Sequence, residues 1–98
     1  MQTNDSQTLV LCALADGPKH GYAINSAIEQ LTGQRLGAGS LYGALSRLEA
    51  KGLLVSEPSD GRQQPVRITN SGRAALEEQL RAMARVSRLG LASLGVQP

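Results

Sequence analysis

The stretch between Gly39 and Gly61 constrains the fold of this chain more than any other segment. Its first half predicts a helix, because leucines recur there at spacings of four and three residues and so line one helical face. These leucines are Leu41, Leu45 and Leu48. Gly52 is placed to end the helix as its C-cap, and the apolar run that follows it predicts a short strand leading into a turn.

The chain returns from that turn through a second predicted strand. Val66 and Ile68 alternate with Arg67, which is typical of a strand with one buried face. Pro65 lacks a backbone N–H and therefore favours an edge strand. Two strands that flank an exposed turn and follow a helix predict a β-wing.

Three further helices are predicted around this unit. A first helix is expected over residues 5–15, a second over 20–33 with Ile24, Ile28 and Leu31 on one face, and a last one from Thr69 or Asn70 onward. The connector before the third helix has the length of a helix-turn-helix turn. The predicted fold class is therefore mainly α with a small β-wing, a winged helix-turn-helix followed by a C-terminal dimerisation helix.

The third predicted helix carries small and cationic residues on the face opposite its leucines. Small side chains let a helix approach another surface closely, and cations one turn apart attract anions, as a helix in the major groove of DNA requires. The alternative is an ordinary solvated helix face. The residues of this face are Ser40, Gly43, Ala44, Arg47 and Lys51.

Length and composition restrict the class of protein. The chain has 98 residues, enough for one modest core that oligomerisation would help to stabilise. We expect no membrane span, no secretory signal and a cytoplasmic location, with Cys12 as a buried small hydrophobe. A net charge of +2 is too small to indicate nucleic acid by itself, but cations outnumber acids between residues 33 and 73.

The residues do not favour an enzyme. The chain has one histidine and one cysteine, and the adjacent Glu77 and Glu78 point in different directions on a helix. His20 has no second ligand at metal-binding spacing, and the pair Gly37 and Gly39 lacks the third glycine of a nucleotide loop. No catalytic residue, metal or cofactor is predicted.

Four blocks of sequence resemble the signature blocks of the PadR family, in that family's order and spacing. They lie at residues 20–24, 36–49, 51–54 and 68–72, and the resemblance covers roughly residues 6–80. It implies a winged helix-turn-helix transcription regulator, usually a dimeric repressor, and some members respond to phenolic or drug-like molecules. Gly43 stands where the family often has proline, which affects helix stiffness, and Val66 where an aromatic is frequent, which affects wing packing.

Carried over residue by residue, the resemblance makes the third helix the recognition helix, with Ser40, Gly43, Ala44 and Arg47 towards base edges. It also implies that Tyr42 reaches the DNA backbone, although the residues alone equally support a half-buried core aromatic. Tyr22 opens the second helix, where free N–H groups favour a phosphate that Lys19 would help to hold; packing is an equal alternative for Tyr22.

In the wing, Arg62 beside the turn apex is expected to grip phosphate or enter the minor groove, unless it merely pairs with Asp60. Gln64 is a candidate base-edge contact, and Arg67 is a backbone contact or a solvated charge. The predicted DNA-binding residues are Lys19, Tyr22, Ser40, Tyr42, Gly43, Ala44, Arg47, Lys51, Arg62 and Gln64.

The last helix carries an apolar stripe longer than one small domain needs to cover, and the first helix is apolar nearly all round. We expect the first helix to pack between its own winged domain and the last helix of a partner. The alternative is a monomer whose last helix folds back on its own core. The predicted interface residues are Leu9, Leu11, Leu76, Leu80, Met83 and Val86, and the predicted domains are residues 1–69 for DNA binding and 70–98 for dimerisation.

Together these features predict a sequence-specific transcriptional regulator that binds double-stranded DNA, as a dimeric repressor on a palindromic operator. The competing hypothesis is a winged-helix protein-interaction module that does not read DNA. The chain has no Trp or Phe, and its residues do not identify an effector.

Overall fold

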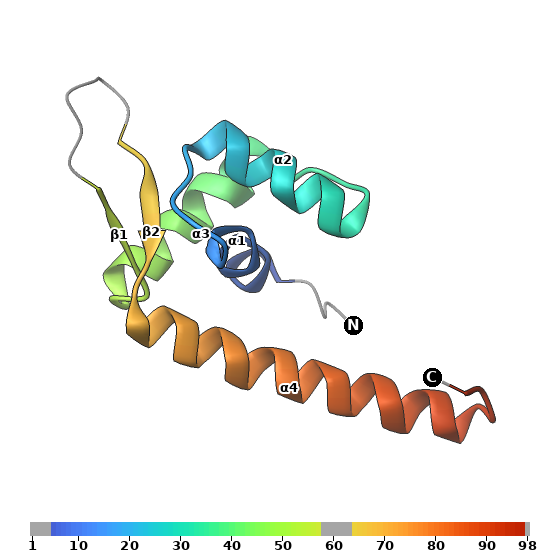
Figure 1. Ribbon diagram of the computed structural model, residues 1–98. Coiled ribbons are helices and arrows are strands. Elements are labelled where there is room, and N and C mark those ends of the chain that lie inside the picture. Colours follow the sequence, from blue (N-terminus) through green and yellow to red (C-terminus); the bar gives the residue numbers. More distant parts are fainter. Residues whose placement is uncertain (1–4, 58–63, 98) are drawn as a thin grey trace.

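The computed structural model describes residues 5–57 and 64–97. Helices α1, α2 and α3 form a compact cluster, strands β1 and β2 stand beside it, and the long helix α4 runs beneath it and beyond it (Figure 1). The elements are α1 (Ser6–Leu14), α2 (Gly21–Thr32), α3 (Ala38–Ala50), β1 (Leu54–Ser56), β2 (Val66–Ile68) and α4 (Asn70–Ser93). The predicted fold class, mainly helical with a small wing, is confirmed.

Local signals set the helix ends. The Asp5 carboxylate accepts a hydrogen bond from the Thr8 amide at 2.9 Å and so caps α1. The Thr69 hydroxyl does the same for α4, accepting from the Gly72 amide at 3.0 Å. Gly33 ends α2 in the left-handed region, with a φ of 83°. The predicted boundaries of these helices are thereby confirmed to within a residue.

The core is built around α1, which contacts α2, α3, α4 and β2. Its buried residues are Val10, Leu11, Ala13, Leu14, Ile24, Ile28, Leu41, Ala44, Leu48, Leu54, Ile68 and Leu76. Leu31, near the end of α2, is 59% exposed, so the core covers Ile24 and Ile28 but not the last residue of that face. Leu45 is only partly buried at the edge of the core.

The sheet contains a pairing that the sequence did not suggest. β1 and β2 are antiparallel, with Leu54 opposite Ile68. On its other side β2 pairs with Lys19, through backbone N–O distances of 3.0 and 2.8 Å between Lys19 and Val66. Among the described residues the sheet has two strands, so β2 lies at an edge, as Pro65 predicts, and the isolated bridge to Lys19 adjoins it at Val66 alone. Pro65 lies just before β2, where its missing N–H interrupts no ladder bond.

The first turns of α4 belong to the core of the winged unit. Gly72 and Leu76 are buried, and the Arg73 guanidinium donates to the Ala15 carbonyl at 3.1 Å. Farther along, α4 leaves the cluster, and Leu80, Val86 and Leu89 are 40%, 55% and 50% exposed. Within residues 5–57 and 64–97, none of the helices combines the length and apolarity needed to cross a membrane.

Candidate nucleic-acid interface

The outer face of α3 is the centre of the candidate interface. Ser40 and Arg47 are exposed on it, as predicted, and Tyr42, which was expected next to the apolar stripe, is exposed as well. Ala44 is not: it is completely buried in the core, so the prediction that it faces base edges is wrong. The reason is geometric, because Ala44 lies three residues after Leu41 and four before Leu48, which places all three on one stripe.

Ser46 is exposed on the same outer face, and sequence reasoning missed it. The signal was present in the helical period. Once Leu41, Ala44 and Leu48 form the buried stripe, positions 43, 46 and 50 lie opposite that stripe.

The Arg47 side chain lies against Gly43, one turn earlier on α3. A Cβ atom built at Gly43 would be 3.1 Å from Nη1 of Arg47. Among the described residues, none forms a hydrogen bond or ion pair with the guanidinium, whose donors therefore face solvent. An exposed guanidinium on a helix surface of small residues is suited to bidentate bonding with a base edge or a phosphate.

Both tyrosines lie on the surface beside α3. Tyr22 and Tyr42 are 71% and 60% exposed, which excludes the alternative that either is a core aromatic. Tyr22 stacks parallel to the His20 ring, with the ring centroids 6.3 Å apart. The Tyr42 hydroxyl approaches Gly21 at the start of α2, where an added Cβ would be 3.1 Å from it.

A hollow of about 270 Å³ joins these elements. It brings the start of α2, the middle of α3 and the wing strand together on one side of the molecule, in agreement with the arrangement in Figure 1. Its lining residues are His20, Gly21, Tyr22, Tyr42, Leu45, Gln64 and Val66. The predicted contacts Tyr22, Tyr42 and Gln64 therefore form a continuous surface.

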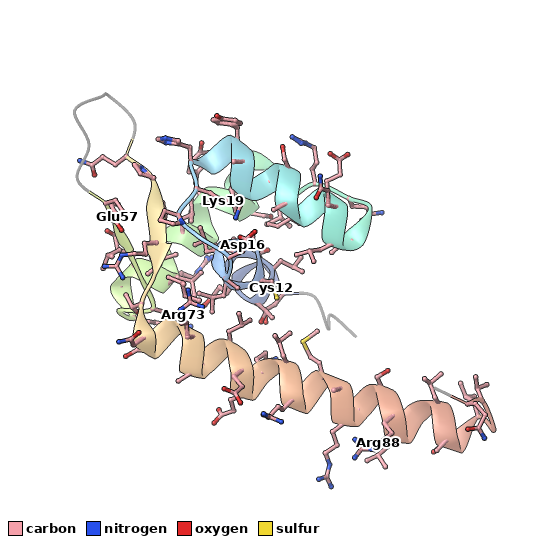
Figure 2. All side chains as sticks on the ribbon, in the orientation of Figure 1. Cys12, Asp16, Lys19, Glu57, Arg73 and Arg88 are labelled. Atoms are coloured by element: carbon pink, nitrogen blue, oxygen red, sulfur yellow. The ribbon has the colours of Figure 1, made fainter. Side chains whose placement is uncertain are left out.

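The start of α2 provides anion-binding backbone groups. His20 occupies the N-cap position without a capping side-chain hydrogen bond, so the first amides of α2 are left for another acceptor. Lys19 lies just before this end, and its ammonium pairs with Asp16, as Figure 2 shows for the labelled side chains. The hydrogen bond and positive charge of Lys19 lower the pKa of the Asp16 carboxyl. Asp16 therefore offsets part of the charge that Lys19 would offer a phosphate.

Two other cations are engaged by the protein itself. Lys51 donates through Nζ to Oε1 of Gln7 at 2.7 Å, which ties the end of α3 to α1. Arg67 pairs with Glu57 across the strands, at 2.6 Å between Nε and Oε1. These contacts favour the non-DNA alternative for Arg67. The predictions for Arg62 and for the turn from Pro58 to Gly61 lie outside the described residues.

The predicted dimer residues separate into two groups. Leu11 and Leu76 are buried in the core of their own chain, 5% and 6% exposed, so their assignment to an interface with a partner is wrong. The physical reason is that α1 is covered by the elements of its own domain. Leu80 and Val86 are exposed, and Leu9 and Met83 are partly exposed.

Cys12 is partly buried on α1 rather than fully buried, and that burial raises the pKa of its thiol. The thiol is therefore held in its neutral, less reactive form. Within the described residues, three or more metal-ligating side chains do not come together.

Comparison with known proteins agrees with this architecture. Residues 10–78 match the family model of the transcriptional regulator PadR-like family. Transcriptional regulator Rv3488 of Mycobacterium tuberculosis is 44% identical over 82 residues, which cover 81% of this chain and 76% of that protein. An uncharacterized 37.1 kDa protein in transposon TN4556 of Streptomyces fradiae is 63% identical over 87 residues, covering 89% of this chain. The match covers only 25% of that relative, so the chain spans about a quarter of its length.

Solved structures give the same assignment. A PadR family transcription regulator from Clostridium difficile is 26% identical and superposes with a TM-score of 0.77, over 91% of this chain and 97% of the other. A transcriptional regulator from Clostridium thermocellum reaches the same TM-score at 25% identity, over 86% and 84% of the two chains. The family match, the close relatives and the shared winged architecture together establish that this chain belongs to the PadR-like family of transcriptional regulators.

Proposed function

We propose that this regulator reads DNA as a homodimer and represses transcription from a palindromic operator. The observation that carries the proposal is the convergence of the start of α2, the outer face of α3 and the wing strand on one side of the molecule. That surface combines exposed tyrosines with uncapped backbone amides, and the exposed Arg47 guanidinium lies farther along the same helix, α3. Groups of this kind bind phosphates and base edges.

In this proposal α3 enters the major groove. Gly43 and Ser46 allow the helix to approach the bases closely, and Arg47 is suited to a bidentate contact with guanine. The first amides of α2 and the Tyr22 and Tyr42 hydroxyls hold phosphates on either side. Lys19 and Gln64 extend this contact towards the wing, and Arg62 remains a proposed wing contact.

The dimer is proposed to form through the C-terminal region of the chain, by the part of α4 that leaves the winged unit. The exposed part of α4 presents Leu80, Met83 and Val86, a surface that a second copy would remove from water. Leu9 on α1 is partly buried against the core, and its exposed part is proposed to contribute to the same interface. The first turns of α4 stay anchored on the winged unit, which links the dimer to the spacing of the two reading helices.

The family resemblance supports repression, whereas a winged-helix module that binds only proteins is the competing function. Salt dependence separates the two, because each neutralised phosphate contributes a slope of about −0.9 to the logarithmic salt plot. A DNA reader loses affinity steeply as salt rises. A protein-interaction module shows little duplex binding at any salt concentration.

The central test is Arg47→Ala, measured on an operator selected from a random pool of duplexes. We expect a loss of about 1–3 kcal/mol in operator affinity and a smaller preference for the operator over random DNA. Arg85→Ala is the matched control, since it removes the same charge from an exposed position on α4. A folded Arg47→Ala protein with unchanged preference would exclude Arg47 from base reading, and absence of any selected duplex would contradict the proposed function.

A further inference from the structure

Asn25 joins α2 to the connector that precedes α3. Its Nδ2 donates to the Leu36 carbonyl at 2.8 Å, and its Oδ1 accepts from the Leu36 amide at 2.8 Å. The side-chain amide thus pairs with both backbone groups of one residue. Because a backbone N–H can only donate and a carbonyl can only accept, this pairing fixes the orientation of the carboxamide.

The connector has few other restraints. It runs from Gly33, which has a φ of 83°, to Gly37, the N-cap of α3. The Gln34 backbone amide donates a hydrogen bond to the Thr32 hydroxyl at the end of α2, at 3.1 Å. The Arg35 side chain reaches Ser26 at 3.1 Å and Glu29 at 3.4 Å, both through exposed contacts.

The Leu36 backbone is therefore the partly buried point at which the middle of α2 holds this segment, beside the exposed contacts of Gln34 and Arg35. Among the described residues, the backbone of Gln34 bonds only to the nearby Thr32 hydroxyl. The backbone of Leu36 bonds to Asn25, eleven residues earlier in the chain. Glycine at both ends of the connector provides little stiffness of its own. Leu36 also packs against the edge of the core, which keeps the hydrogen-bonded pair partly shielded from water.

The position of this residue pair determines where α3 starts. The helix begins at Ala38, two residues beyond Leu36, and continues through the face that carries Gly43 and Arg47. A displacement of its first turn shifts those groups relative to the amides at the start of α2. Base reading depends on side chains placed to within a fraction of an ångström, so a loose start would weaken specific contacts first.

We propose that Asn25 is the positioning residue that sets α3 against α2 for operator reading. It acts through Leu36 and does not itself contact DNA. The inference rests on the proposed function. It names Asn25 as a residue on which the preference for operator over random DNA depends. Phosphate contacts made by the start of α2 do not need this alignment and supply the non-specific binding.

The test compares Asn25→Ala and Asn25→Asp with a matched control, Ser26→Ala. Aspartate keeps an acceptor for the Leu36 amide but loses the donor for its carbonyl, so it retains half of the pair. Ser26→Ala removes an exposed contact to the Arg35 side chain and leaves the Leu36 backbone bonds intact. Each protein is measured for molar mass, thermal unfolding, hydrogen exchange of the Leu36 amide, and affinity for the operator and for random duplex.

We expect Asn25→Ala to lower operator affinity about tenfold, as the loss of one or two partly buried hydrogen bonds implies, with random-duplex affinity unchanged. The Leu36 amide exchanges faster, Asn25→Asp is intermediate in both measurements, and Ser26→Ala behaves as the parent. A merely structural role would lower the unfolding temperature while leaving the ratio of the two affinities unchanged.

The outcomes separate the inference from the function on which it rests. If the parent prefers its operator and the folded Asn25 variants show the same preference, the positioning role of Asn25 is wrong and the proposed function stands. If the parent shows no preference for any duplex, both the proposed function and the positioning role of Asn25 are wrong. Should Asn25→Ala not fold, the half-paired Asn25→Asp decides: a ratio equal to the parent's overturns the proposal, and a reduced ratio supports it.

Discussion

At the scale of single residues, the placement of Arg47 depends on the lack of a side chain at Gly43. The guanidinium lies over the helix backbone, close to the position that a Cβ would occupy. Gly43 has no left-handed backbone conformation to maintain, because its φ is not among the positive values in this chain. Gly43 therefore matters because its missing side chain leaves space for Arg47 and for a surface that approaches α3.

Because Gly43 is needed for space and not for its backbone conformation, Gly43→Ala should change stability and DNA binding in opposite directions. Alanine in a helix interior is better than glycine by about 0.5–1 kcal/mol, so chemical denaturation should give a higher free energy of unfolding. The new methyl displaces the end of a flexible side chain, and operator affinity should fall as Arg47 moves. A variant that is less stable than the parent would show that this part of α3 is packed more tightly than the structure indicates.

At the scale of elements, α4 does two different things along its length. Its first turns close the core of the winged unit, and its remainder extends from the cluster. The two glycines of this helix, one in the packed first turns and one in the exposed remainder, differ in the space around them. A Cβ at Gly72 would overlap the Leu53 carbonyl oxygen and lie 2.7 Å from Cγ1 of Ile68, whereas a Cβ at Gly90 would meet nothing within 4 Å.

Gly72→Ala and Gly90→Ala should therefore have opposite effects on unfolding. The first forces a backbone carbonyl and a packed isoleucine to move, and we expect a loss of about 3 kcal/mol in the free energy of unfolding. The second adds a good helix former at an open position and should gain about 0.8–1 kcal/mol. Equal unfolding temperatures for the two variants would contradict the close packing of α4 on β2.

At the scale of the whole molecule, the chain is elongated because of α4. Its principal extents are 54 × 26 × 20 Å, and α4 continues well past the helical cluster in Figure 1. A groove of about 490 Å³ runs along this helix, with Leu76 and Leu80 among its lining residues. Arg73, Glu77 and Arg81 line the same groove, and Figure 2 shows Arg88 on the side of α4 that points away from the cluster.

Leu80→Glu tests the proposed dimer. Its control is Arg88→Glu, which introduces the same side chain on the side of α4 that points away from the cluster. A carboxylate at Leu80 would be buried without a partner, so we expect a monomer by molar mass in solution and a large loss of operator affinity. Arg88→Glu should keep the mass of the parent. If Leu80→Glu also keeps that mass and the parent's affinity, the dimer assignment is wrong.

Much of the secondary structure was readable from the sequence because its signals are local. Asp5 and Thr69 cap helices within three residues of themselves, and Gly33 ends α2 by its own conformation. The alternation of Val66 and Ile68 with Arg67 likewise needs only a strand period. For the candidate site, the same periodicity placed Ser40, Gly43 and Arg47 on the outer face of α3.

The tertiary structure decided what depends on neighbours distant in sequence. Ala44 and Leu45 both have helical spacing to Leu41 and Leu48, and the packing of α3 on the rest of the core determines that Ala44 is fully buried and Leu45 only partly. Leu11 and Leu76 resemble interface residues until their own domain is seen to cover them. The pairings of Lys19 with Val66 and of Asn25 with Leu36 leave no local pattern, because each joins backbone or side-chain groups that meet only after the chain has folded. The sequence thus determines the elements and their faces, and packing determines which faces remain free to bind.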